Sequence, residues 1–220
     1  APVVGLGSDT GSSAKDGITK DGTLSLTGTE NGSLIEYSVD GGKSWSTTFS
    51  AIEGGNTVLV RQTDVAGNTS AAQSFSFTLD TTAAAPGLNL SSDTGSLSTD
   101  KVTNVGTVTV AGLESGSTWD YSTDNGTTWS TGSGSSVKLT GDGSKSVIVK
   151  QTDLAGNTSA NSTALSFTLD TVAPTTSVST ITISSDTGSS TTDFITNVST
   201  QTVSGNLSGV IASGDVVKVS

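Results

Sequence analysis

Carboxylate side chains that could bind a cation are the main reactive groups of this chain. Its 220 residues include 20 Asp and Glu but only nine Lys and Arg, and the formal net charge is −11. The chain has no His, Cys or Met. It therefore lacks the side chains of Ser-His-Asp or Cys-His catalysis, of ordinary zinc sites and of disulfides. The negative charge favours divalent cations and disfavours nucleic acid and anionic membranes as partners.

These carboxylates recur in two groups. In the first, Asp64 and Asp153 each open an Asp-x-Ala-Gly-Asn motif, while Asp80 and Asp170 each follow Phe-Thr-Leu. The second group pairs the Asp of a Ser-Asp-Thr-Gly motif with an Asp seven residues later. The first group, with two Glu residues and two Asn residues, is Glu30, Asp64, Asn68, Asp80, Glu114, Asp153, Asn157 and Asp170. The second group is Asp9, Asp16, Asp93, Asp100, Asp186 and Asp193.

The motifs that contain these residues divide the chain into similar units. Ser-Asp-Thr-Gly begins at residues 8, 92 and 185, and the ten-residue motif Gln-Thr-Asp-x-Ala-Gly-Asn-Thr-Ser-Ala begins at residues 62 and 151. Corresponding positions are 84 to 93 residues apart, about the size of one seven-stranded immunoglobulin-like sandwich. The sequence therefore predicts an all-β fold made of tandem immunoglobulin-like β-sandwich domains in an elongated array.

Three domains are predicted. The first covers residues 1–80 and the second 81–170, with a linker at 81–85. Residues 171–220 match only the N-terminal part of a third, because Ser220 aligns with the end of the third strand. Half a sandwich cannot bury a complete core, so we expect this part to be frayed or paired with a neighbouring molecule.

Strands must position the carboxylates, because helix-forming residues are scarce and short runs alternate between apolar and polar residues. Disorder is the competing interpretation of so polar a chain. The residues predicted to face the core of the second domain are Leu88, Leu90, Val108, Val110, Trp119, Tyr121, Val137, Leu139, Val147, Val149, Leu165, Phe167 and Leu169. Hairpin turns are predicted at residues 40–42 and 124–126. Trp45 and Trp129 fit hairpin or core aromatics, or a platform for carbohydrate.

Topology predicts where the first group meets. Asp153 begins the loop between the last two strands of its domain, and Glu114 lies in the loop between the second and third. Both loops belong to the N-terminal end of the sandwich, where the preceding domain delivers Asp80. Three carboxylates would repel one another there, and calcium, which takes 6 to 8 oxygen ligands, would neutralise them. Asn157 could add a neutral oxygen, although plain Asx turns would also explain the Asp and Asn pairs.

Domain 1 repeats part of this arrangement with Glu30, Asp64 and Asn68. The second group lies in the loop between the first two strands, at the opposite end of each domain. It could bind another calcium ion or could form turns in a solvated loop, and both interpretations stay open.

Together the repeated motifs resemble the bacterial immunoglobulin-like repeats of giant non-fimbrial adhesins exported by type I secretion. The residues that carry the resemblance are SDTG with its following Asp, YSxDxG with Trp, QTDxAGNTSA, and FTLDT followed by Ala-Pro. The resemblance implies a secreted, cell-surface virulence protein, whose stalk is stiffened by calcium at domain junctions and whose tip binds a host-cell glycan or receptor. It also implies that Asp80, Asp153 and Asp170 are junction ligands.

Three classes of function follow. The first is a calcium-stiffened spacer, whose partners are the neighbouring repeats of the same chain. The second is a glycan-binding module that uses Trp45 or Trp129 with nearby Asp and Asn. The third is a hydrolase with paired carboxylates, which the sequence disfavours because no unit has an insertion that could build a pocket. No apolar run is long enough for a membrane helix and no targeting signal opens the chain, so no membrane insertion by this segment is expected.

Overall fold

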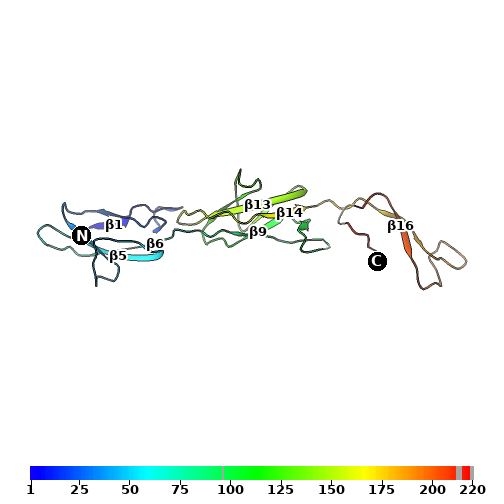
Figure 1. Ribbon diagram of the computed structural model, residues 1–220, viewed down its shortest axis with the longest axis horizontal. Coiled ribbons are helices and arrows are strands. Elements are labelled where there is room, and N and C mark those ends of the chain that lie inside the picture. The colour runs from blue at the N-terminus through cyan, green and yellow to red at the C-terminus, as the bar shows by residue number, and fades with distance from the viewer. Residues whose placement is uncertain (96, 212–214, 219–220) are drawn as a thin grey trace. The chain divides into compact units, whose positions relative to one another are not determined.

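The computed structural model describes residues 1–95, 97–211 and 215–218. It contains two compact units, Ala1–Asp170 and Thr171–Ser220, and Figure 1 shows strands and loops throughout. The described residues form no helix, which confirms the all-β prediction. No helix in these ranges could therefore cross a membrane. Within the first unit, domain 1 denotes residues 1–80 and domain 2 denotes residues 81–170.

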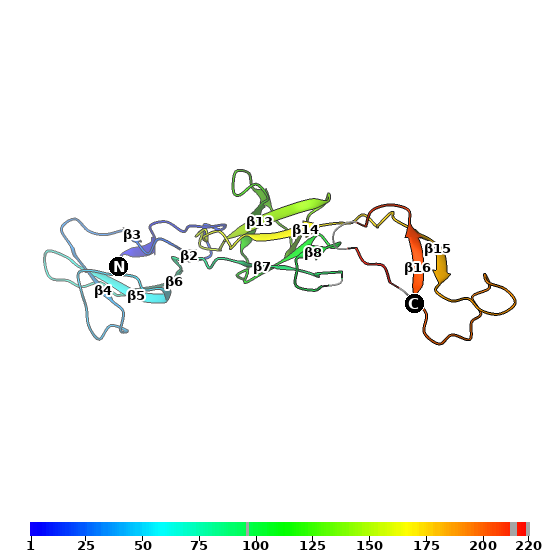
Figure 2. The same cartoon turned by 45° about the vertical axis from the view of Figure 1, so that its right-hand side comes forward.

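Domain 2 has two sheets that face each other across its core (Figure 2). The strands of the larger sheet, in spatial order, are β11 (Ser130–Thr131), β10 (Thr118–Ser122), β13 (Gly143–Thr152), β14 (Leu165–Leu169) and β8 (Val102–Thr103). Those of the smaller sheet are β12 (Ser136–Lys138), β9 (Thr107–Ala111) and β7 (Gly87–Leu90). Neighbouring strands are antiparallel except β14 and β8, which are parallel.

The core of domain 2 comes from the alternating residues that the sequence pattern selects. Trp119 on β10 is only 4% exposed, and its indole N–H donates to the carbonyl of Gly134 at 2.8 Å. The buried cluster is Val108, Val110, Trp119, Val137, Leu139, Val147, Val149, Phe167 and Leu169. Leu88, Leu90, Tyr121 and Leu165 pack against it. The predicted core positions of this domain are thus confirmed.

One short strand was missed by the pattern. β8 lies in the stretch that the sequence analysis treats as a loop between the first two strands, and it pairs with β14. Thr103 is buried there, and its hydroxyl donates to the carbonyl of Ser92 at 2.9 Å. A threonine can be buried when its hydroxyl makes a hydrogen bond, but it is not counted as an apolar residue in the sequence pattern. The strand therefore could not be seen from hydrophobic periodicity.

Domain 1 repeats this plan with fewer strands. Its sheets are β2 (Ile18–Thr19), β6 (Gln73–Leu79), β5 (Gly54–Thr63) and β4 (Leu34–Ser38) on one side, and β1 (Val3–Leu6) with β3 (Leu24–Thr27) on the other. In residues 1–80, no strand matches β12. The connection from Trp45 to Gly54 is five residues shorter than the one from Trp129 to Gly143, which leaves too little chain for an edge strand.

The missing strand leaves the core of domain 1 partly open. Phe49 fills some of the space, with its ring stacked on Tyr37 at 6.0 Å and edge-on to Phe77 at 6.4 Å between ring centroids. Leu24 is only half-buried, whereas its counterpart Val108 is fully buried. A cavity of about 610 Å³ opens here between the two sheets.

The second unit contains one antiparallel pair, β15 (Val178–Ile183) and β16 (Val203–Leu207). Apolar residues on both strands are exposed within the unit, among them Val178, Ile181, Val203 and Leu207. Residues 215–218 of the predicted third strand form no strand. Its end at Ser220, and residues 212–214 before it, lie outside the described residues.

Candidate metal centre

Three carboxylates meet where domain 1 joins domain 2. Asp80 follows β6 of domain 1, Glu114 lies between β9 and β10, and Asp153 follows β13. One carboxylate oxygen from each lies within 4.8 Å of the others. The structure thus brings together the three residues that strand order predicted to converge. Among the described residues, these are the only three Asp or Glu side chains so grouped.

Asp153 is fixed by the loop that it opens. It is 5% exposed, and its two carboxylate oxygens accept the backbone N–H and the side-chain amide of Asn157, both at 2.8 Å. The same amide donates to the backbone carbonyl of Asp80 at 2.7 Å. Asn157 therefore turns its amide nitrogen toward the carboxylates. In this arrangement Asn157 positions Asp153 and ties the two domains together, whereas the expectation was that it could add a neutral oxygen ligand.

Gln151 holds Glu114 and the linker, although it is not among the predicted site residues. Its side chain is fully buried; its oxygen accepts the N–H of Glu114 at 2.8 Å, and its nitrogen donates to the carbonyl of Ala84 at 2.7 Å. The N–H of Ala84 donates in turn to a carboxylate oxygen of Glu114 at 2.8 Å. The signal was present, because a polar residue opens the repeated Gln-Thr-Asp motif at a position that alternates with buried valines.

Burial shapes the electrostatics of this cluster. Partial burial raises the pKa of Asp80 above its usual value, and the negative charges of Asp153, Glu53 and Glu114 raise it further, against the lowering effect of the Thr82 N–H. Burial and these neighbouring negative charges thus oppose ionisation of Asp80. A divalent cation would remove that repulsion, so the residues present fit a calcium ion.

A family model described as a bacterial Ig-like domain matches residues 1–81 and again residues 82–171. The chain belongs to the bacterial Ig-like domain family. A solved structure described as a tetra-tandem repeat in the extending region of a large adhesion protein is similar at 21% identity and a TM-score of 0.31. The match covers 84% of this chain and 52% of that one, so this chain spans about half of its length. No curated protein matched.

The first bacterial Ig-like domain has the same Asp-x-Ala-Gly-Asn loop at residues 64–68. Among the described residues, no aspartate lies beside this loop in the way that Asp80 lies beside Asp153. Asp64 accepts the backbone N–H and the side-chain amide of Asn68, both at 2.8 Å, as Asp153 does with Asn157. Gln62 accepts the N–H of Glu30 at 2.9 Å. Asp170 follows β14 as Asp80 follows β6, and its backbone N–H donates to the carbonyl of Thr103 at 3.0 Å.

The second group of aspartates forms the same loop three times. In domain 2, Asp93 accepts the N–H of Lys101 and Asp100 accepts the N–H of Val102, both at 3.0 Å. Asp9 with Asp16, and Asp186 with Asp193, make the corresponding contacts. Turn formation thus uses one oxygen of each aspartate. The other oxygen, Oδ1, of Asp9, Asp93 and Asp186 is buried without a hydrogen-bond partner in the described residues.

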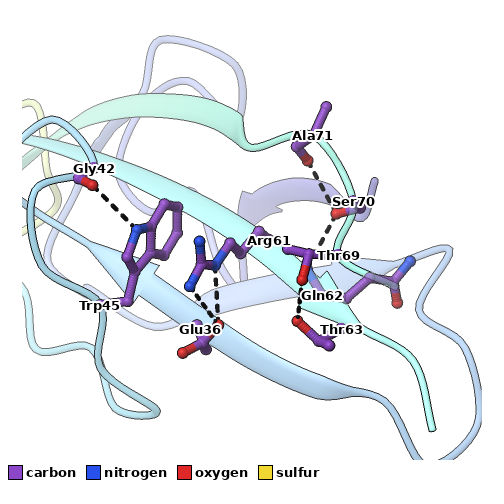
Figure 3. Close-up of polar contacts among 9 residues, drawn as sticks. All are labelled: Glu36, Gly42, Trp45, Arg61, Gln62, Thr63, Thr69, Ser70 and Ala71. Atoms are coloured by element: carbon purple, nitrogen blue, oxygen red, sulfur yellow. Dashed lines mark hydrogen bonds and ion pairs between the residues drawn. The ribbon is translucent and has the colours of Figure 1, made fainter. Parts of the chain in front are cut away.

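Trp45 and Trp129 belong to hairpins on the outer face of the larger sheet, one in each bacterial Ig-like domain. Figure 3 shows Trp45 donating its indole N–H to the carbonyl of Gly42, at 3.2 Å, while Arg61 lies against the ring and pairs with Glu36. The guanidinium carbon is 3.9 Å from the ring centroid. Lys150 covers Trp129 at 4.1 Å in the same way. A cation therefore covers one of the two faces on which a sugar could stack, which favours the hairpin interpretation.

The raised pKa of Asp80 predicts opposite pH dependences with and without calcium. In metal-free protein, lowering the pH from neutral to near the ordinary aspartate value of 3.8 should stabilise the junction, because the folded state binds the Asp80 proton more tightly than the unfolded state does. This gain develops as the pH falls through the raised pKa toward the ordinary value of 3.8. With saturating calcium the same acidification should destabilise the junction, because a protonated carboxyl is a poor ligand.

Denaturant unfolding of the whole chain at the two pH values, with and without calcium, measures both trends. Asp80→Asn is the control, since it removes the titrating group while keeping the shape of the side chain. An equal pH dependence in wild type and Asp80→Asn would show that Asp80 is not its source.

Proposed function

We propose that this chain is a spacer segment of a bacterial surface adhesin, in which calcium stiffens the junction between successive bacterial Ig-like domains. The observation that carries this proposal is the meeting of Asp80 from one domain with Glu114 and Asp153 from the next, with their oxygens within 4.8 Å. An ion shared by these residues would cross-link the two domains beside the short linker that connects them. A flexible pair of domains would then become a semi-rigid one.

The protein's own side chains prepare this site. Asn157 orients Asp153, and Gln151 orients the backbone of Glu114 and holds Ala84 of the linker. Calcium would supply the positive charge that offsets the repulsion among the three carboxylates. Carboxylates already held in place lose little side-chain freedom on binding, so the arrangement favours binding of the ion.

The loops of the second aspartate group are proposed as further calcium sites. Their support is the buried Oδ1 of Asp9, Asp93 and Asp186, which has no hydrogen-bond partner in the described residues. A buried carboxylate oxygen without a partner is costly, and a bound cation would satisfy it. Asp16, Asp100 and Asp193 would provide a second carboxylate in each loop.

In this proposal the segment lies outside the cell, where calcium is abundant enough for weak sites to fill. Its role is mechanical and non-catalytic, and its direct partners are the neighbouring repeats. Export by type I secretion, membership of the giant non-fimbrial adhesins and attachment to a host-cell glycan or receptor through the full-length protein belong to the same proposal. They are supported by the motifs and by the family.

Calorimetric titration with calcium tests the junction site. Asp153→Asn and Asp80→Asn are each expected to weaken one binding event by roughly 10- to 100-fold, because each removes a charged ligand from a prepared site. Asp64→Asn is the matched control, since Asp64 has the same motif position and the same bonds to Asn68 but is not grouped with two other carboxylates among the described residues. Equal loss of the tightest binding event in Asp64→Asn and Asp153→Asn would contradict the junction site.

The stiffening itself is tested by small-angle scattering of wild type and Asp153→Asn with calcium and with chelator. The maximum dimension of wild type should become more narrowly distributed when calcium is added, and that of Asp153→Asn should not. A wild-type curve that does not respond to calcium would refute the stiffening role.

A further inference from the structure

We propose that successive domains are also joined by a metal-independent contact between two sequence motifs. The SDTG loop denotes residues 8–11 and its repeats 92–95 and 185–188; the DxAGN loop denotes residues 64–68 and its repeat 153–157. We infer that the SDTG loop of one domain is a docking surface for the DxAGN loop of the next. The partner that fits either loop is therefore another domain of this kind.

The junction of domains 1 and 2 shows this contact. The hydroxyl of Thr10 donates to the carbonyl of Ala155 at 2.6 Å, and the ammonium of Lys20 donates to the carbonyl of Gly156 at 2.8 Å. Ala155 is completely buried. None of these contacts uses a carboxylate, so the pairing of the loops does not depend on a cation.

Gly11 sets how closely the two loops approach. Its backbone has φ of +93°, and a Cβ atom at this position would lie 1.8 Å from the carbonyl oxygen of Leu154. Backbone, and not a flexible side chain, is the obstacle, so no larger residue can be accommodated without separating the loops. The glycine of the motif is thus required by the neighbouring domain as well as by its own turn.

The other copies of the SDTG loop have the same backbone hydrogen bond, but their threonine hydroxyls donate to a different partner. The hydroxyls of Thr94 and Thr187 donate to the side-chain oxygens of Asn104 and Asn197, at 3.0 and 2.9 Å, within their own domains. The threonine hydroxyl accepts the same backbone N–H in each copy, for instance that of Asn104 at 2.8 Å. The loop is therefore preformed, and in the junction its hydroxyl donates to the partner instead.

The DxAGN loop of domain 1 presents the complementary half. Val65 and Ala66 occupy the positions of Leu154 and Ala155, yet Val65 is 83% exposed and Ala66 is also exposed. The bonds from Asn68 to Asp64 hold this loop in the shape of its counterpart. Its surface thus fits the SDTG loop of a further bacterial Ig-like domain.

A glycine pair in the chain provides the test. Gly11→Ala and Gly95→Ala both place a side chain at positive φ, +93° and +106°, but only Gly11 faces a backbone oxygen closer than 4.0 Å. Both are made in the full chain and compared in chelator, so that the outcome is independent of calcium. Proteolysis of the linker at residues 81–85 and hydrogen exchange of amides 154–157 report whether the junction is open.

We expect Gly11→Ala to raise the cleavage rate of the linker about tenfold or more, and Gly95→Ala to leave it close to wild type. Thr10→Val against Thr94→Val is a second pair, which removes the hydroxyl without strain at a glycine. Hydrogen exchange of β5 confirms that domain 1 is folded in each variant. The proposal is overturned if wild type in chelator is cleaved as fast as Gly11→Ala, or if the members of both pairs behave alike.

Discussion

Replacing Trp119 with alanine should lower the free energy of unfolding of domain 2 by about 3–5 kcal/mol. The side chain is 4% exposed and belongs to the central cluster of the core. Gly132 lies so close to the ring that a Cβ atom there would be 2.3 Å from it, so the indole is enclosed on several sides. The substitution also removes the bond to the Gly134 carbonyl, and a rigid pair of sheets cannot fill the cavity.

Hydrogen exchange of the β13 amides, combined with denaturant unfolding, assigns this loss to domain 2. Trp129→Ala is the matched control, because Trp129 is half-buried and lies against Lys150 outside the core. It should cost about 1 kcal/mol, the scale of an exposed cation–π contact. Similar losses for the two tryptophans would mean that Trp119 is not the centre of the core.

Gln151→Ala should destabilise domain 2 by about 2–4 kcal/mol and should also loosen the linker. The substitution leaves the N–H of Glu114 and the carbonyl of Ala84 without their buried partner. A third hydrogen bond is lost as well, the one that the Gln151 amide nitrogen donates to the carbonyl of Gly112 at 3.2 Å. Because Glu114 then loses its backbone support, calcium binding at the junction should weaken together with stability.

Gln62→Ala separates the two effects. Gln62 bonds to Glu30, Ser33 and Gly28 of its own domain, and none of these residues lies in the 81–85 linker. It should therefore destabilise domain 1 without increasing cleavage at residues 81–85. If cleavage of the linker is unchanged in Gln151→Ala, the bond to Ala84 does not secure it.

Strand positions were predictable where one face of a strand is apolar. Val108 and Val110 alternate with threonine, so their burial on β9 followed from a period of two. Thr103 on β8 and Gln151 on β13 are buried polar residues, and what stabilises them is a set of hydrogen bonds that hydropathy does not record. These residues were therefore missed.

The candidate site was predictable to the same extent as the topology. The ends of β6, β9 and β13 determine which loops meet, and Asp80, Glu114 and Asp153 could be placed from strand order alone. The orientation of Asn157 could not, because its amide bonds to both Asp153 and the backbone of Asp80 across the domain boundary. The contact of Thr10 with Ala155 was missed for the same reason, since its partners lie in different repeats.

Domain 1, residues 1–80, lacks a strand that corresponds to β12. This difference affects how a chain under tension would unfold. Leu24, Tyr37 and Phe49 border an opening in domain 1, and domain 2 has the additional strand β12 beside β9, the counterpart of β3. The core of domain 1 is therefore held by fewer strand pairs than that of domain 2. Under tension we expect domain 1 to unravel first while domain 2 stays folded. Unfolding of domain 1 would then lengthen the chain by roughly 250 Å. This extension would limit the force that reaches the more completely packed domain 2.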